Sequence, residues 1–209
     1  PLTVTIDPKS TTNRGTTPGV NLRATVKKYG MSQGKIATRT YLFMSSILTQ
    51  TDPNGSWPNP GTVNSQDLDY DMDGNVVGST LYKDSIDDAL LSIPTYSITT
   101  DVANLMNTTS GIYVNASQDG FAWERPANIE LLDFNGTPGF NIDGGIRIRG
   151  GYSRIGSNPK HAFRLFFRDE YGKKKLHYPL FENEGDDVFD KFDLRTSQNY
   201  SWSYGSYAD

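Results

Sequence analysis

The chain has 209 residues and a net charge of −4, from 20 basic and 24 acidic side chains, and it contains no cysteine. An acidic balance argues against general nucleic-acid binding, which requires a basic surface. The lack of cysteine excludes disulfide scaffolds, cysteine-ligated zinc and thiol catalysis. No run of about 18 apolar residues occurs, so the sequence predicts no transmembrane helix. With 20 glycines, 11 prolines and 12% aromatic residues, the composition indicates a turn-rich β protein.

The first part of the chain, residues 1–43, reads as the remains of a small β module. Apolar residues alternate with polar ones over 2–6 and 20–26, which predicts two strands. A third strand is predicted over 36–43, where Thr38, Thr40 and Tyr41 suit a pleated surface. The segment 28–31 contains a glycine and is predicted to be a turn.

Residues 44–80 are interpreted as a linker that begins with a short helical or irregular stretch. The segment 52–61 holds three prolines and two glycines, so regular structure is not expected there.

The remaining region, 81–209, is predicted to be mostly β with one helix. Apolar residues recur at helical spacing from Ile86 to Ile93, and Pro94 indicates that this helix ends at about Ser92. Asn135-Gly136 is a hairpin signal. Strands are predicted over 95–99, 112–114, 127–134, 145–149, 162–167 and 189–194. We therefore expect a mostly β, α+β fold of antiparallel sheets with one or two short helices.

A glycine-rich basic stretch, GGIRIRGGYSRIGSNPKHAFRLFF over 144–167, is the most distinctive part of the sequence. Glycines let a backbone approach a ligand closely, and consecutive N–H groups can hold a phosphate. Arg149, Arg154 and Lys160 would add positive charge beside such a loop. The alternative is a basic hairpin loop with a solvated face.

A second candidate site is the acidic sequence DLDYDMDGN over 67–75. Asp69, Asp71 and Asp73, followed by Gly74, match the first ligands of a Ca²⁺ loop. Position 12 of that loop is Thr80 instead of glutamate, so the alternative is an acidic, solvated turn.

Two hydrolytic arrangements stay open as hypotheses. Ser153 with His161 or His177 could form a nucleophilic site, although no GxSxG elbow occurs. Glu124, Glu130 and Asp133 lie close enough in sequence to supply a carboxylate pair for glycoside hydrolysis. The alternative for Glu124 is a structural ion pair with Arg125.

Aromatic residues near the C-terminus and in the proline-rich segment suggest a sugar-binding or interface surface, because exposed aromatic rings stack on sugars and mark contacts. They are Trp57, Tyr200, Trp202, Tyr204 and Tyr207.

Several of these motifs, taken in order, resemble the CotH family of spore-coat protein kinases, in particular its large extracellular bacterial members. They are GIRIRGGYSR with PKHAFR, IPTYSI, GIYVN, WERP, KLHYPLF and FDLRTS, and they extend over about 81–209. Residues 1–43, through the phrases NLRA and TRTY, resemble part of the C-terminal β-sandwich module of chitobiases.

The CotH resemblance implies a kinase N-lobe in which Lys160 contacts nucleotide phosphates and a glycine/serine loop covers them. Its predicted nucleotide-binding residues are Arg149, Gly150, Gly151, Ser153, Arg154 and Lys160, with Mg·ATP as the ligand. The family's catalytic aspartate and metal-binding acid lie further along its chain than Asp209. We therefore expect 81–209 to be an N-lobe that stops before the C-lobe and is not a competent kinase.

Together these observations favour a piece of an extracellular or cell-surface bacterial protein that acts as a non-catalytic binding or structural module, with a polysaccharide or other surface component as a candidate partner. A nucleotide-binding kinase lobe is the first alternative, and a hydrolase is the second. Self-association through surface that the missing lobe would cover is a further expectation.

Overall fold

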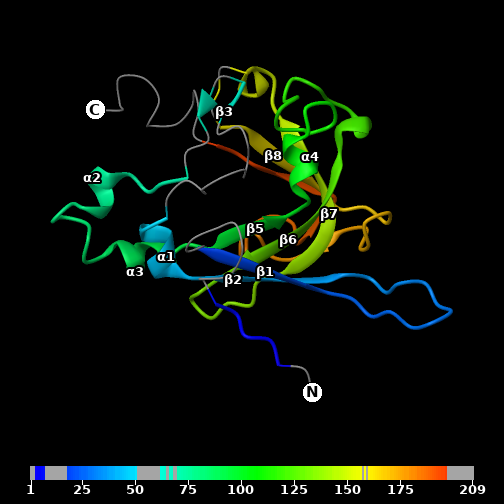
Figure 1. Cartoon of the computed structure of the whole chain (residues 1–209), viewed down its shortest axis with the longest axis horizontal. Coiled ribbons are helices and arrows are strands. Elements are labelled where there is room, and N and C mark those ends of the chain that lie inside the picture. Colours follow the sequence, from blue (N-terminus) through cyan, green and yellow to red (C-terminus); the bar gives the residue numbers. More distant parts are fainter. Residues whose placement is uncertain are drawn as a thin grey trace. The chain divides into compact units, whose positions relative to one another are not determined.

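A computed structural model describes residues 3–7, 18–50, 62–64, 66–67, 70–156, 158 and 160–196 (Figure 1). Most regular structure is in antiparallel strands, with a few short helices, which confirms the predicted mostly β, α+β class. Within these ranges no helix has the length and apolar character needed to cross a membrane.

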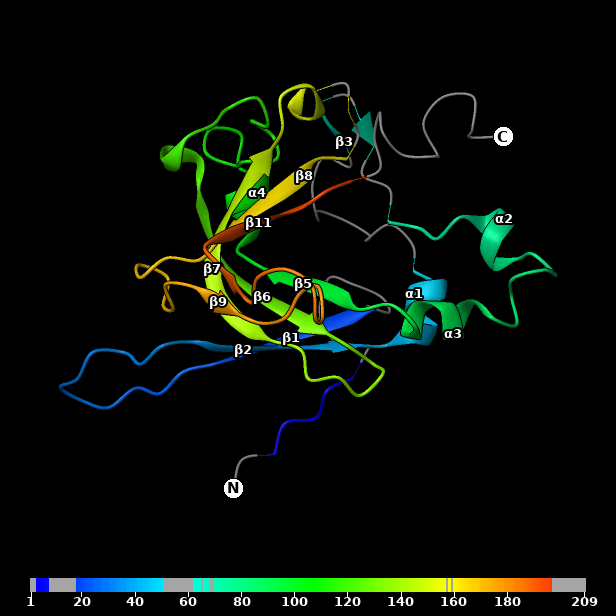
Figure 2. The ribbon, with the colours of Figure 1, turned by 180° about the vertical axis from the view of Figure 1, so that it is seen from behind.

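The largest sheet has five strands in the order β11-β8-β7-β6-β5. Its strands are β5 (Thr95–Thr99), β6 (Arg125–Leu132), β7 (Asn141–Arg149), β8 (Ala162–Phe166) and β11 (Lys191–Leu194), several of which are visible in Figure 2. In β7 and β8, Ile146 pairs with Leu165, and both are 0% exposed. Their burial anchors this pair of strands, because each fully buried aliphatic side chain contributes about 1.5–3 kcal/mol.

Three two-stranded sheets complete the strands. They are β1 (Gly19–Ala24) with β2 (Ala37–Leu42), β3 (Thr62–Val63) with β4 (Gln66–Asp67), and β9 (Leu176–His177) with β10 (Val188–Phe189).

The helices are short. They are α1 (Met44–Leu48), α2 (Gly74–Val77), α3 (Ile86–Leu91), α4 (Val102–Met106) and the 3₁₀ turns η1 (Phe121–Trp123) and η2 (Tyr152–Arg154). The predicted helix end is confirmed, since Ser92 caps α3 and donates its N–H to the Asp88 carbonyl.

Two strand predictions are wrong. The described residues 3–7 form no strand. Residues 112–114 form turns, because the backbone N–H groups of Ile112 and Tyr113 donate to the carbonyl oxygens of Asn104 and Leu105 in α4. These donors are used locally, so they are unavailable for a sheet ladder.

The chain divides into two compact units. One contains residues 1–60, 69–99 and 129–141, and the other contains 61–68, 100–128 and 142–209. The boundaries predicted at residues 43 and 80 stay predictions.

Candidate functional site

An arginine-lined cleft with a volume of about 390 Å³ lies in the second unit. Four arginines and a single carboxylate contribute charge to its wall. The lining residues are Asp119, Gly120, Arg147, Ile148, Arg149, Gly150, Gly151, Arg154, Arg164 and Phe166. Each of these arginines is ion-paired, with Asp119, Glu124 or Asp193, but the arginines outnumber these carboxylates, so the cleft is a candidate site for an anion. We call it the arginine cleft.

Strand alternation places the arginines together. Arg147 and Arg149 are two residues apart in β7, so they share one face, whereas Ile146 and Ile148 point into the core. Arg164 of β8 pairs with Arg147 across the ladder, which puts both side chains on the same face. The guanidinium of Arg147 lies 4.0 Å above the Phe166 ring, an arrangement that orients its plane.

Asp193 of β11 connects two of the arginines. Arg164 donates to it through Nε at 2.6 Å and Nη2 at 2.9 Å, and Arg149 donates through Nε at 2.7 Å. The hydrogen bond from Arg164 holds the pKa of Asp193 below its ordinary value, against the opposing effect of burial. Asp193 thus fixes two guanidinium groups and leaves their remaining N–H donors for other acceptors.

Glu124 holds a second arginine pair. Its carboxylate, only 1% exposed, lies 3.2 Å from Arg147 Nε and 3.0 Å from Arg168 Nε. Burial and the neighbouring Glu124 charge raise the pKa of Tyr171 to about 12. A Cβ at Gly145 would lie 2.5 Å from Glu124 Oε1, so the carboxylate occupies the space that this glycine leaves.

Two buried guanidinium nitrogens in the cleft make no hydrogen bond within the described part of the chain, namely Nε of Arg147 and Nε of Arg154. The 3.2 Å contact of Arg147 with Glu124 is an ion pair without hydrogen-bond geometry. Arg154 donates to the Ile148 carbonyl at 3.2 Å and has a 3.4 Å ion pair to the exposed Asp119. Both Nε atoms are buried, so neither is open to a ligand in the cleft, and a ligand would have to meet the remaining guanidinium donors of these arginines.

The loop after β7 is held by its own polar groups. Gly150 has φ +112°, and the Ser153 hydroxyl donates to the Arg149 carbonyl at 3.1 Å. His161 Nδ1 donates to the Ser153 carbonyl at 3.0 Å, and Asn158 donates to the Tyr152 carbonyl at 2.8 Å. The Ser153 hydroxyl thus anchors the loop.

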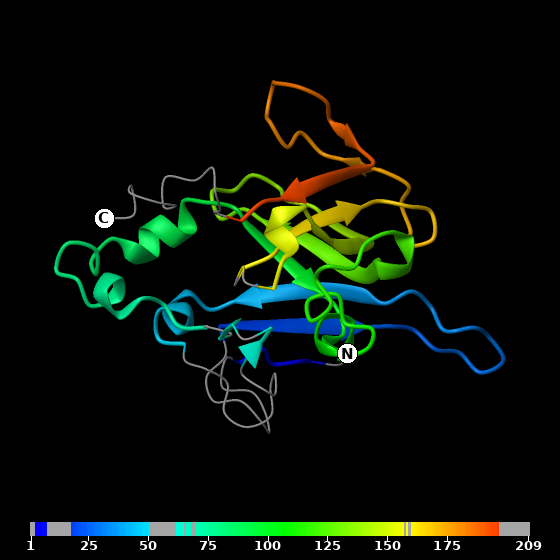
Figure 3. The same cartoon turned by 90° about the horizontal axis from the view of Figure 1, so that it is seen from above.

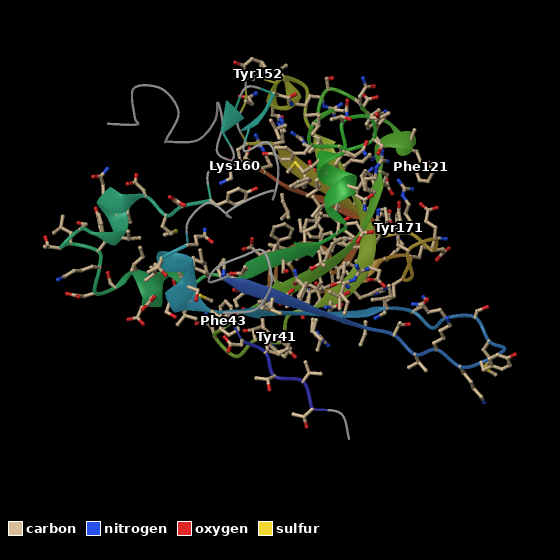
Figure 4. All side chains as sticks on the ribbon, in the orientation of Figure 1. Tyr41, Phe43, Phe121, Tyr152, Lys160 and Tyr171 are labelled. Carbon is tan, nitrogen blue, oxygen red and sulfur yellow. The ribbon has the colours of Figure 1, made fainter. Side chains whose placement is uncertain are left out.

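The six predicted nucleotide-binding residues are only partly brought together. Arg149, Gly150, Gly151 and Arg154 line the cleft. Ser153 supports it, and the exposed Lys160 is outside the lining residues. Figure 4 shows Lys160 well separated in projection from Phe121, the residue after Gly120 of the cleft wall.

The sequence patterns did not predict three residues of this site, namely Arg147, Arg164 and Asp193. The alternation in GIRIR carried a signal for Arg147 beside Arg149. Asp193 carried none, because it reaches the arginines from a strand 29 residues beyond Arg164.

The acidic segment is described in part. Asp69 lies outside the described residues, Asp71 is exposed, and Asp73 caps α2 by accepting from Asn75 N at 2.7 Å. In the ranges given above, no three potential metal-ligating side chains form a group. The Ca²⁺ site stays a prediction.

The carboxylates of the hydrolase hypothesis make structural contacts. Glu130 accepts from Arg39 Nη1 at 2.8 Å and Thr40 N at 2.9 Å, and Asp133 accepts from Asn135 N at 2.8 Å. Burial would raise the pKa of Glu130, but these hydrogen bonds outweigh it and lower that pKa.

The expected Glu124–Arg125 ion pair is wrong, although Glu124 is ion-paired. The Arg125 guanidinium donates to the carbonyls of Ser110, Ala122 and Glu124 instead, while the Glu124 carboxylate pairs with Arg147 and Arg168. Adjacent residues of an extended segment point in opposite directions, which favours the more distant partners.

The aromatic residues singled out above, Trp57, Tyr200, Trp202, Tyr204 and Tyr207, lie outside the described residues. His177 is exposed in β9.

Comparison with protein-family models, with curated proteins and with solved structures gives no match to this chain. The fold is mostly β, and the site is an arginine-lined cleft. The CotH resemblance therefore rests on the sequence motifs alone.

Proposed function

We propose that this chain is a non-catalytic binding module that takes a phosphorylated ligand in the arginine cleft, with Mg·ATP as the ligand that the CotH resemblance implies. The observation that carries the proposal is the convergence of four arginines on one cleft wall.

Guanidinium groups match phosphate oxygens in charge and in fork geometry, and they pair with them through two parallel hydrogen bonds. Asp193 supports the proposal, because it orients Arg149 and Arg164 without occupying all of their donors. A volume of about 390 Å³ is within the range of small-molecule sites, about 300–1,000 Å³.

Catalysis is not part of the proposal. Phosphoryl transfer needs a positioned base and a metal clamp as well as phosphate-binding groups. The CotH resemblance assigns neither of those roles to a residue of this chain. An extracellular or cell-surface location also rests on that resemblance, whereas a polysaccharide partner rests on the aromatic residues named in the sequence analysis.

The test is a calorimetric titration of Mg·ATP, and separately of pyrophosphate, into the chain and into three variants. Arg154→Gln removes a cleft arginine, and Lys160→Ala removes the lysine that the resemblance selects. Arg23→Gln, in β1 of the other unit, is the matched control. Hydrogen bonds to charged groups are worth about 1.5–3 kcal/mol, so Arg154→Gln should weaken binding about 10- to 100-fold.

Loss in Arg154→Gln with no change in Arg23→Gln would support the cleft. If Lys160→Ala alone abolished binding, the phosphate site would lie on the lysine side of the loop and the cleft assignment would be wrong. Absence of binding to both ligands by the unmodified chain would refute the proposal.

A further inference from the structure

Basic charge is concentrated in one part of the sequence. Between Pro8 and Thr51 there are seven basic and no acidic side chains, although the whole chain carries −4. The rest of the chain therefore has a net charge of −11. Such segregation makes the basic segment attractive to an anionic partner that the remainder repels.

The connection between β1 and β2 presents part of this segment as an ordered tip. Gly34 N donates to the Val26 carbonyl at 2.9 Å, and Met31 N donates to the Lys28 carbonyl at 3.0 Å. Gly30, at φ +79°, allows the tight turn that follows Tyr29. Figure 3 shows this connection extending beyond the ends of both strands. We call residues 25–36 the hairpin tip.

The hairpin tip exposes apolar side chains among lysines. Val26 is 77% exposed, Met31 is 64% exposed and Tyr29 is fully exposed. Lys27, Lys28 and Lys35 are exposed beside them. Large apolar side chains in full contact with water, next to cations, are typical of a surface that meets a partner.

We propose that the hairpin tip is a peripheral docking site for a bilayer surface rich in anionic phospholipid. Lysine ammonium groups pair with the phosphates of the headgroups, while apolar and tyrosine side chains enter the interfacial layer. The contact is superficial and requires no segment that crosses the membrane.

A lipid surface fits this tip better than a soluble polyanion or an acidic protein. Lysines alone would suffice for a soluble polyanion, and Val26, Tyr29 and Met31 would then remain in water. An anionic bilayer interface offers phosphate groups to the lysines and an apolar layer to Val26, Tyr29 and Met31 at the same time. The proposal is independent of the arginine cleft, because that cleft is built from residues of the other unit.

The experiment uses the full chain and a site-specific fluorophore, which is possible because the sequence contains no cysteine. Met31→Cys labelled with the environment-sensitive dye NBD reports on the hairpin tip. Leu81→Cys with the same label is the control, since Leu81 is 80% exposed and lies in the turns between α2 and α3. Both proteins are mixed with vesicles of phosphatidylcholine, alone or with about one-third phosphatidylglycerol.

The label at position 31 should brighten and shift to the blue with the anionic vesicles only, and the label at position 81 should not respond. Each lysine near such a surface is worth about a five-fold change in partitioning. The triple variant Lys27→Gln/Lys28→Gln/Lys35→Gln should therefore bind on the order of 100-fold more weakly. The charge-matched triple Lys83→Gln/Lys173→Gln/Lys174→Gln should bind as the unmodified chain does.

Several outcomes would overturn the proposal. They are equal binding to neutral and anionic vesicles, an unresponsive label at position 31, or equal loss in the two lysine triples. Binding of heparin or polyphosphate at the tip, with no vesicle binding, would assign the tip to a soluble polyanion instead. Tyr29→Ser/Met31→Ser, which keeps all charges, should weaken vesicle binding while leaving heparin binding unchanged, and the reverse result would also refute a lipid partner.

Discussion

Replacing Gly150 by alanine tests how the loop beside the arginine cleft is held. Gly150 has φ +112°, which side chains disfavour, and its added Cβ would lie 1.8 Å from Ser153 Oγ. The Ser153 hydroxyl would have to leave the position from which it donates to the Arg149 carbonyl. The substitution therefore combines backbone strain with the loss of one hydrogen bond.

The magnitude follows from these two effects. Placing a side chain at a positive φ of this kind costs about 1–3 kcal/mol, and a hydrogen bond of this type contributes about 1 kcal/mol. We expect the Gly150→Ala variant to lose about 2–4 kcal/mol of unfolding free energy. In a Ser153→Ala background, where the hydrogen bond is already absent, the same change should cost about 1 kcal/mol less.

Urea unfolding followed by tryptophan fluorescence measures these differences, with linear extrapolation to water. Gly151→Ala is the matched control, since the Cβ at Gly151 meets nothing within 4 Å and its φ is −98°. That variant should change stability by less than about 0.5 kcal/mol. Equal effects of the two alanine substitutions, or full additivity with Ser153→Ala, would refute the interpretation of this loop.

Three further predictions concern the ion pairs. Glu124→Gln should destabilise the chain by about 2–3 kcal/mol in chemical denaturation, because two arginines lose a shared buried carboxylate but are themselves partly solvated. Absorbance titration should detect one tyrosine with a pKa of about 12 that is lost in Tyr171→Phe, and Glu124→Gln should move this pKa toward 10. The Asp193 carboxylate, whose pKa is lowered by the Arg164 hydrogen bond, should stabilise the fold fully above about pH 3.9 and lose that contribution as pH falls through its lowered value. Stability measured from pH 2 to 5 should therefore depend less on pH in Asp193→Asn, and an unchanged slope would contradict the assigned pair.

Much of the local structure could be predicted from short-range patterns. The helical spacing before Pro94 predicted α3, and alternation predicted β1, β6 and β7. Asn135-Gly136 predicted the turn between β6 and β7, where Gly136 has φ +86°. These features depend on side-chain period and on backbone freedom at a few residues, which neighbouring residues in sequence determine.

The same patterns failed where distant backbone groups compete. Ile112 to Val114 has the composition of a strand, but their N–H groups bond to the carbonyls of α4. A pattern of apolar residues predicts burial, and Ile112 is indeed buried. Such a pattern does not determine which carbonyl oxygen accepts the hydrogen bond of each backbone N–H.

The sequence alone determined the mostly β class, the basic glycine loop and the segregation of basic residues before position 52. The tertiary structure decided which of the loop's residues line a cleft. It brought Arg164 and Asp193 to Arg149, and Arg168 to Glu124, over separations of up to 44 residues. Strand order and register create these neighbours, and they depend on the packing of the whole sheet, so no local stretch of sequence could specify them.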